Sequence, residues 1–320
     1  MRERAPLITY ILVALAAILW GTNFNLAKPV LAEMPPLVAG ADRYLIAAAI
    51  MLIITCINGE RPPLRHFRAY LILGLIGVFG FNVFFFLGMA GTSPVNGALI
   101  MALNPLLTSL IARVILGDRP TPRQWLAFPA GLIGVAIVVL GAGAHVHIAH
   151  GDALMFIANL NWAFYNVYVR KLAPTDTSGV ANTAGIMSTG AVALTVVALL
   201  SGEAFVIPDL RAGGALLAMS VSGGVLSYLF WNAGIAKMGP ARAAIFMNLV
   251  PVASMVIAAF SGAPPNHAQL LGGALVIGAV TFSALSPASA VVTAPGSLRA
   301  CAPPLAGTCT LDAAKEPAEM

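Results

Sequence analysis

The feature that most restricts the fold of this chain is its series of long apolar runs. Each run has about 20 residues, the length of helix that crosses about 30 Å of hydrocarbon. Hydrophobic residues make up 59% of the 320 and charged residues only 9%, which is far from the usage of soluble domains. Lipid offers backbone groups no hydrogen-bond partner, so each run is expected to be helical. The sequence therefore predicts an all-α membrane protein with ten transmembrane helices, at residues 7–27, 37–57, 69–90, 94–116, 124–142, 152–170, 179–200, 213–235, 241–260 and 268–286.

The basic residues predict how these helices are oriented. Ten crossings place both termini on one side, and Lys and Arg concentrate in cytoplasmic segments. With the N-terminus inside, 14 of the 17 basic residues are cytoplasmic, and the others are Lys28, Arg43 and Arg211. We therefore expect a multi-pass protein with cytoplasmic termini. The net charge of +5 reflects this topology and does not indicate a nucleic-acid partner.

A repeated segment divides the chain into two halves. Residues 94–105 recur as residues 240–251, an offset of 146, with Met101 over Met247 and Pro105 over Pro251. Each of the two later prolines removes a helical hydrogen bond and frees the carbonyl four residues earlier, at Met101 and Met247. We therefore expect an interrupted helix in each half, with Pro105 and Pro251 in a gating role. Interrupted helices at matching positions are typical of a transport site.

The match between the halves extends beyond the prolines. Trp20 lies over Trp162 at an offset of 142, and Gly77 lies over Gly223 at the offset of 146. We assign a first repeat to residues 1–143, a second to 151–286, and a disordered cytoplasmic tail to 287–320, which is rich in Ala, Pro, Ser and Thr. Each repeat has five crossings, an odd number, so the second is expected to be inverted. Such an arrangement can expose one midplane site alternately to either side.

Several short motifs resemble a known family. The chain resembles a ten-helix, EamA-type member of the drug/metabolite transporter superfamily over about residues 7–286. The residues that carry the resemblance are Trp20-Gly21, Asn23-Phe24, Lys28, Arg43, Pro105, Gly117-Asp118, Gly151-Asp152, Trp162-Ala163, Tyr165-Asn166 and Pro251. The resemblance implies two EamA-like repeats and export of amino acids or related small metabolites from the cell. The chain departs from the family pattern at Gly262, which has no acidic neighbour.

Amides are unusually frequent in the apolar runs. An unpaired amide is costly in hydrocarbon, so each must face protein or water. Asn159, Trp162 and Asn166 are spaced i, i+3 and i+7, which places two amides and an indole on one helical face. This face is the preferred candidate for a binding cavity, and interhelical hydrogen bonding is the alternative. The amides are Asn23, Asn82, Asn96, Asn104, Asn159, Asn166, Asn232 and Asn248.

Aromatic and charged side chains complete the predicted substrate site. The rings could bind a ligand or belong to the interfacial aromatic belt. Arg43 could bind a substrate carboxylate, pair with Asp42, or serve at a helix end. Asp152 fits the start of a helix. The candidate substrate-binding residues are Trp20, Asn23, Arg43, Asn82, Asn104, Asn159, Trp162, Tyr165, Asn166, Tyr228, Trp231 and Asn248.

The sequence predicts no cofactor, no metal and no enzymatic activity. It contains no phosphate-binding P-loop, no His-Glu-x-x-His zinc helix and no Gly-x-Ser-x-Gly turn. His145, His147 and His150 could bind a metal, but their spacing is weak evidence without a fourth ligand, and a solvated loop accounts for all three. Three cysteines do not make a disulfide framework.

These observations lead to one preferred function and two alternatives. We expect a secondary transporter of the bacterial inner membrane, with a small-molecule substrate and the lipid bilayer as partners, that exports amino acids or related metabolites by alternating access. A broader drug or nucleotide-sugar carrier is the first alternative, and a structural membrane protein without transport is the second. No Asp, Glu or His lies near the middle of a predicted span, so we expect facilitated or potential-driven movement rather than proton coupling.

Overall fold

The computed structural model describes residues 6–117, 122–140, 150–238 and 240–284, and all regular structure in this part is helical. His145 and His147, Asp118, and the tail at 287–320 lie outside the described residues. Six helical stretches are long and apolar enough to cross a membrane: Leu7–Glu33, Pro36–Ile57, Leu64–Ala90, Pro94–Leu116, Gly179–Leu200 and Leu210–Met238. Shorter apolar helices lie at Trp125–Gly134, Ile245–Phe260 and His267–Ala279.

The helices follow one another with short connections. The first part of the chain contains α1 (Leu7–Glu33), α2 (Pro36–Ile57), η1 (Leu64–His66), α3 (Phe67–Leu73), η2 (Gly74–Gly80), α4 (Phe81–Ala90), α5 (Pro94–Met101), α6 (Asn104–Leu116) and α7 (Pro122–Leu140). The second contains α8 (His150–Leu172), α9 (Gly179–Leu200), α10 (Leu210–Met219), η3 (Ser220–Leu226), α11 (Ser227–Met238), α12 (Pro240–Ala244), η4 (Ile245–Asn248), α13 (Leu249–Phe260) and α14 (His267–Ala284).

The end of α1 differs from the predicted span. The apolar run ends at residue 27, but the helix continues to Glu33 through Pro29. Asn25 donates to the Ser254 carbonyl over 3.1 Å, and Lys28 Nζ donates to the Thr92 carbonyl over 3.0 Å. The helix therefore extends past the apolar run, because carbonyl groups of neighbouring segments accept hydrogen bonds from its polar side chains.

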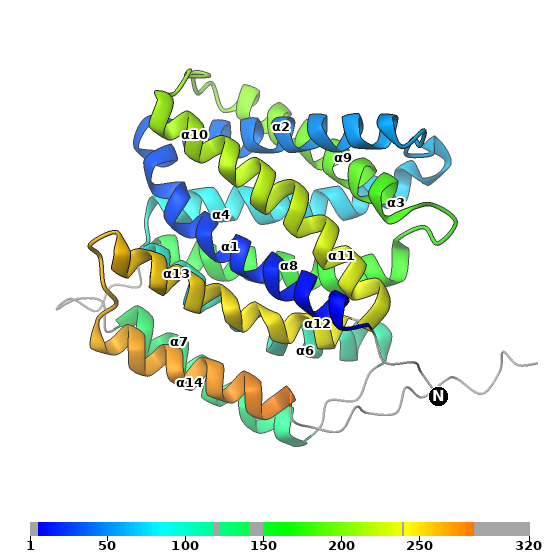
Figure 1. The fold of residues 1–320 in the computed structure, drawn as a ribbon. Coiled ribbons are helices and arrows are strands. Elements are labelled where there is room, and N and C mark those ends of the chain that lie inside the picture. Colours follow the sequence, from blue (N-terminus) through cyan, green and yellow to red (C-terminus); the bar gives the residue numbers. More distant parts are fainter. Residues whose placement is uncertain (1–5, 118–121, 141–149, 239, 285–320) are drawn as a thin grey trace, which may run out of the picture. The chain divides into compact units, whose positions relative to one another are not determined.

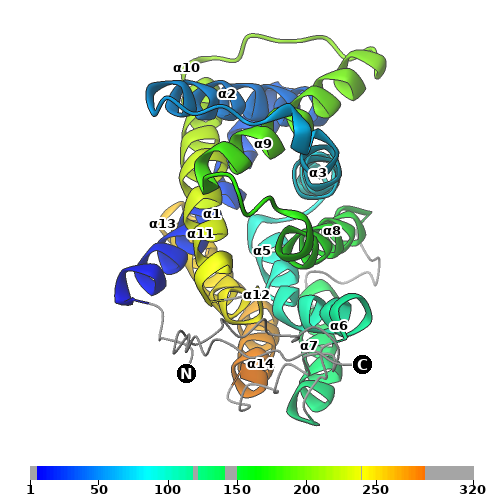
Figure 2. The same ribbon diagram turned by 90° about the vertical axis from the view of Figure 1, so that its right-hand side faces the viewer.

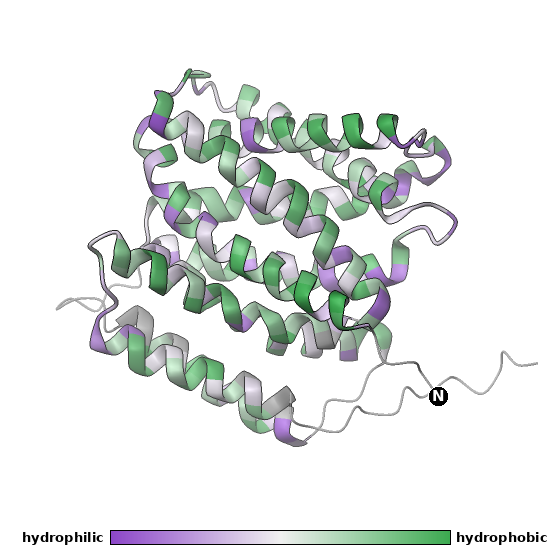
Figure 3. Ribbon diagram, viewed as in Figure 1, coloured by the Kyte–Doolittle hydropathy of each residue, from purple (hydrophilic) through white to green (hydrophobic). Residues whose placement is uncertain are grey.

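Helices from distant parts of the sequence pack side by side. Extensive contacts join α7 to α14, α2 to α9, α1 to α10, α11 and α13, α8 to α4 and α6, and α9 to η2. The two ribbon views show α7 with α14 at one edge and α2 with α9 near the opposite edge (Figures 1 and 2). Apolar residues occur along all of the helices (Figure 3), and many large apolar side chains, such as Ile53, Leu200 and Phe260, are exposed. Such a surface suits a lipid surrounding.

Both repeated proline segments contain a helix interruption. The α-helix stops after Met101 and resumes at Asn104, so Pro105 lies in the first turn of α6, where a missing N–H costs little. The equivalent segment passes through the 3-10 turn η4 before α13 begins at Leu249. The carbonyl reached by a neighbouring helix is that of Ile100, one residue before the expected Met101, and it accepts from Asn159 Nδ2 over 2.8 Å.

Two π-helical segments were not expected from the sequence. They are η2 and η3, and their first residues, Gly74 and Ser220, are 146 residues apart, the offset of the paired prolines. Glycine is needed in both because other side chains press against the backbone. A methyl group on Gly77 would overlap the Tyr165 ring, and one on Gly223 would overlap the Asn23 amide. Segments of π-helix are rare and often occur at functional sites.

Candidate substrate pocket

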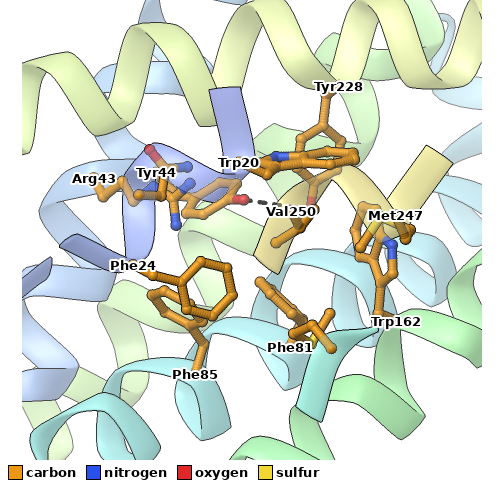
Figure 4. A pocket seen from close by; sticks show the side chains of 12 residues that line it. Trp20, Phe24, Arg43, Tyr44, Phe81, Phe85, Trp162, Tyr228, Met247 and Val250 are labelled. Carbon is orange, nitrogen blue, oxygen red and sulfur yellow. Dashed lines mark hydrogen bonds between the residues drawn. The ribbon is translucent and has the colours of Figure 1, made fainter. Parts of the chain in front are cut away.

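A small pocket lies where α1, α2, α4, α5, α8, α11, η4 and α13 meet (Figure 4). The cavity volume is about 30 Å³. One water needs roughly 10–15 Å³ by this measure, so the pocket is nearly closed in this conformation. It is lined by Trp20, Asn23, Phe24, Arg43, Tyr44, Phe81, Phe85, Met101, Trp162, Tyr228, Met247 and Val250.

Aromatic rings form most of the pocket wall. The Trp20 ring centroid is 5.1 Å from that of Trp162 and 5.9 Å from that of Tyr228, both in edge contacts. Trp162 also lies 5.4 Å from Tyr228 and 5.4 Å from Phe81. Trp162 and Tyr228 are buried in the protein, which rules out a place for them in the lipid-facing aromatic belt.

Two backbone carbonyls of the π-helical segments hold aromatic donors. Trp20 Nε1 donates to the Gly223 carbonyl over 2.9 Å, and the Tyr228 hydroxyl donates to the Gly77 carbonyl over 2.8 Å. Gly77 and Gly223 are equivalent by the repeat offset. The donors are not equivalent, because the counterpart of Trp20 is Trp162, whose buried Nε1 has no partner among the described residues. The two halves thus have equivalent carbonyl acceptors, but Gly223 accepts from a tryptophan and Gly77 accepts from a tyrosine.

Arg43 brings a positive charge into the pocket wall (Figure 4). Its side chain is 2% exposed, and Nη1 donates to Asn82 Oδ1 over 3.1 Å. The guanidinium carbon lies 5.2 Å from the Tyr44 ring centroid and 6.0 Å from that of Phe86. Buried Nε has no hydrogen-bond partner in the described structure. An amide and two rings therefore fix the position of this guanidinium.

No described carboxylate neutralises Arg43. The salt bridges found among the described residues involve Arg65, His66 and Asp176. Asp42 precedes Arg43 on α2 and is half-buried, but neighbouring helical residues point in different directions. The local Asp42–Arg43 pair considered from the sequence is therefore not formed here. The pocket carries an uncompensated positive charge.

Three of the candidate amides form a buried network beside the pocket. Asn104 Nδ2 donates to Asn159 Oδ1 over 2.8 Å, and Asn166 Nδ2 donates to Asn104 Oδ1 over 3.0 Å. Trp231 Nε1 donates to Asn166 Oδ1 over 3.1 Å. Together with the Asn159–Ile100 bond, these contacts connect the interruption between α5 and α6 to α8 and α11. The network stabilises the interruption and does not line the pocket.

The structure thus divides the predicted site residues into groups. Trp20, Asn23, Arg43, Trp162 and Tyr228 line the pocket, and Asn82 binds Arg43. Tyr165 stacks on Trp162 at 4.9 Å between centroids and donates to Asn232 over 3.1 Å. Asn248 is 8% exposed, lies outside the lining, and its Oδ1 has no partner among the described residues.

Sequence reasoning missed part of the pocket wall. Tyr44, Phe81, Phe85 and Val250 were not assigned to the site, because aromatic and aliphatic residues of an apolar helix look the same in sequence whether they pack or line a pocket. Phe24 is part of the Asn23-Phe24 motif, and Met101 and Met247 are equivalent residues of the repeat; all three line the pocket. A search for matched pairs near helix interruptions would have found the two methionines.

The remaining charged groups lie away from the pocket. In the connections after α2 and α8, Arg65 and His66 contact Asp176 at 2.7 and 2.9 Å. The hydrogen bond from His66, followed by that from Arg65, lowers the pKa of Asp176. Asp152, in the first turn of α8, accepts from the Thr92 hydroxyl over 2.5 Å. Within the described ranges, no three His, Cys, Asp or Glu residues group as metal ligands.

Comparisons with known proteins identify the family. The EamA-like transporter family model matches residues 7–140 and again 149–285. Uncharacterized transporter YyaM of Bacillus subtilis (strain 168) is 39% identical over 284 residues, covering 86% of this chain and 93% of that protein. Uncharacterized inner membrane transporter YedA of Escherichia coli (strain K12) is 24% identical over 244 residues, covering 75% of this chain and 78% of that one. A solved crystal structure at 22% identity has the same fold, with a TM-score of 0.68 over 87% of this chain and 98% of that one. The chain belongs to the EamA-like transporter family and is a multi-pass membrane transporter.

Proposed function

We propose that this transporter exports a small metabolite that bears a carboxylate, with amino acids as the first class to test, across the bacterial inner membrane by alternating access. The observation that carries the proposal is the buried Arg43 guanidinium in the pocket wall, which has a free Nε and no described counter-charge. A buried charge without a partner is strongly unfavourable. A substrate carboxylate would supply the partner and could accept two parallel N–H bonds.

Ten crossings in two inverted repeats would account for the pattern of helix contacts. Exchanging the two halves pairs α1 with α8, α2 with α9, and α7 with α14. It also pairs α4 with α11 and α6 with α13. Under this exchange the α2–α9 contact and the α7–α14 contact each map onto themselves. The α1–α11 contact becomes the α8–α4 contact, and the α1–α13 contact becomes the α8–α6 contact, and all four are present. The two family matches, at 7–140 and 149–285, also support a repeat. We further propose that both termini are cytoplasmic, as the distribution of basic residues indicates.

The pocket supports alternating access by being small and by involving both halves. A space of about 30 Å³ holds no organic substrate, so binding requires a more open conformation. The lining includes Met101 and Met247, which adjoin the two helix interruptions. Interruptions and π-helical segments are places where helices can change their course without unfolding.

Counterflow in proteoliposomes tests this proposal. A panel of labelled amino acids, simple monocarboxylates and a nucleotide sugar would be offered to protein preloaded with the unlabelled compound. We expect saturable counterflow of at least one carboxylate compound, and at least a several-fold loss in Trp162→Ala. Trp125→Ala is the matched control, since Trp125 is 56% exposed on α7. A preference for the nucleotide sugar would favour the broader carrier, and absence of counterflow for every carboxylate compound would overturn the proposal.

A further inference from the structure

The charge inventory of the pocket narrows the class of substrate. Arg43 is the charged residue among those lining the pocket, and the described lining includes no carboxylate. The polar lining groups are Asn23, the hydroxyls of Tyr44 and Tyr228, and the two indole N–H groups. The Tyr44 and Tyr228 hydroxyls bond to each other over 3.3 Å. The site as described therefore offers one positive charge and no negative charge to a ligand.

This inventory distinguishes an anion from a zwitterion. The carboxylate of either ligand would gain the guanidinium as its partner. The ammonium of an amino acid would lose its water within a few ångströms of the same guanidinium and find no anion. Contact with a tryptophan face would recover only part of that desolvation cost. A ligand without the ammonium avoids the cost altogether.

The rest of the wall specifies the body of the ligand. Trp20 and Trp162 present rings at 5.1 Å centroid separation, and Phe24 and Phe85 at 5.3 Å. These distances are typical of aromatic pairs, whose edge-to-face packing an inserted aromatic ring can continue. In Figure 4, Arg43 lies at one end of the pocket and Trp162 at the other, with rings between them. A ligand with a carboxylate at one end and an aromatic ring in the rest of the molecule matches this arrangement of the pocket wall.

Resting on the proposed function, we infer that the substrate class is the aromatic monocarboxylates that lack an ammonium group, with the carboxylate at Arg43 and the ring among the aromatic residues of the wall. Such an anion explains transport without a proton carrier in the described pocket wall. An inside-negative membrane potential expels a monoanion, and about 100 mV corresponds to an about 50-fold concentration ratio for one charge. A zwitterion receives no such drive.

Four ligands with the same ring test the inference on the full-length protein. These are 3-phenylpropionate, phenylalanine, phenethylamine and 3-phenylpropionamide, which are an anion, a zwitterion, a cation and a neutral amide. Binding is measured by quenching of tryptophan fluorescence in nanodiscs, and flux by counterflow in proteoliposomes. We expect 3-phenylpropionate to bind at least about 10-fold more tightly than phenylalanine, and phenethylamine to bind most weakly.

Two substitutions at Arg43 separate charge from geometry. Arg43→Gln should weaken 3-phenylpropionate at least about 10-fold while leaving the amide within about 3-fold, because only the anion needs the charge. Arg43→Lys should keep the preference for the anion over the amide but weaken it, since an ammonium lacks the planar fork. Arg65→Gln is the control, because Arg65 lies on an exposed connection. Folding of each variant is checked by its melting temperature without ligand.

The outcomes separate this inference from the proposed function. The aromatic-anion class is overturned if phenylalanine binds as tightly as 3-phenylpropionate, or if none of the four ligands binds. In either case, counterflow of another carboxylate compound would leave the proposed function standing. Outward flux of 3-phenylpropionate should rise with an imposed inside-negative potassium diffusion potential, and phenylalanine flux should not. Flux independent of that potential would overturn the proposed driving force.

Discussion

The two glycine carbonyls of the π-helical segments predict opposite effects for equivalent tryptophan substitutions. In the described conformation Trp20 Nε1 donates to Gly223, whereas Trp162 Nε1 is buried without a described partner. If the halves exchange conformations during transport, Trp162 should donate to Gly77 in the opposite state and Trp20 should lose its bond. Trp20→Phe should therefore disfavour the described conformation, and Trp162→Phe should favour it.

The size of the shift follows from a single neutral hydrogen bond. Such a bond contributes about 0.5–1.5 kcal/mol, which changes the ratio of two states about 2- to 13-fold. Both substitutions remove the same ring atoms, with Trp162 buried and Trp20 partly buried in the described conformation, and each variant is the control for the other. The double variant should return toward the starting ratio, because each state then loses one bond.

Distances between spin labels measure the ratio of states. Arg61 and Thr175 are exposed on the connections after α2 and α8, so cysteines there can carry labels after Cys56, Cys301 and Cys309 are replaced by serine. Pulsed electron paramagnetic resonance in nanodiscs gives the distance distribution for the parent, the two single variants and the double variant. A shift in the same direction for both single variants, or no shift in either, would refute the exchange of tryptophan partners.

Three further predictions concern other parts of the molecule. Pro105→Ala restores a backbone N–H donor at the start of α6. We expect normal membrane insertion but a bias in the side of the membrane to which the pocket opens, measured by cysteine labelling from each face. Unchanged labelling with normal flux would make this proline merely structural. Gly151→Ala should lower thermal stability, by about 1–3 kcal/mol, because its methyl group would lie 2.5 Å from the Gly88 carbonyl oxygen; a melting temperature equal to that of the parent would contradict the close packing. The lowered pKa of Asp176 stabilises the fold above pH 3.8, and this contribution disappears as the pH falls through the lowered value. Asp176→Asn should therefore melt slightly below the parent at pH 7 and converge with it once the pH has fallen through that lowered pKa; a difference that persists at still lower pH would assign the effect to something other than this carboxylate.

The helical architecture was predictable because lipid restricts the chain so strongly. Apolar runs placed the helices to within a few residues, and the paired prolines placed an interruption in each half. The ends were less accurate where polar residues continue a helix through tertiary hydrogen bonds, as Lys28 does with Thr92. The π-helical segments were missed, because a local change of hydrogen-bond register depends on contacts such as that between Gly77 and Tyr165.

The binding pocket was only partly predictable for a similar reason. Arg43 and Trp162 stood out as a charge and an indole in apolar helices, and both line the pocket. An asparagine looks the same in sequence whether it faces a cavity or another amide. Asn159 and Asn166 share a helical face with Trp162, yet they bond to Asn104 instead of lining the pocket. The residues that surround each side chain decide between these roles.

The clustering of tryptophans around the pocket gives the protein a built-in optical reporter. Of its four tryptophans, Trp20, Trp162 and Trp231 lie within 6.4 Å of one another between ring centroids, and Trp125 lies on the outside of α7. Indoles at this separation exchange excitation energy and couple in their ultraviolet circular dichroism. Replacing Trp125 by phenylalanine would leave an emission that arises from the three tryptophans in and beside the pocket, so ligand entry could be followed in real time without any attached dye.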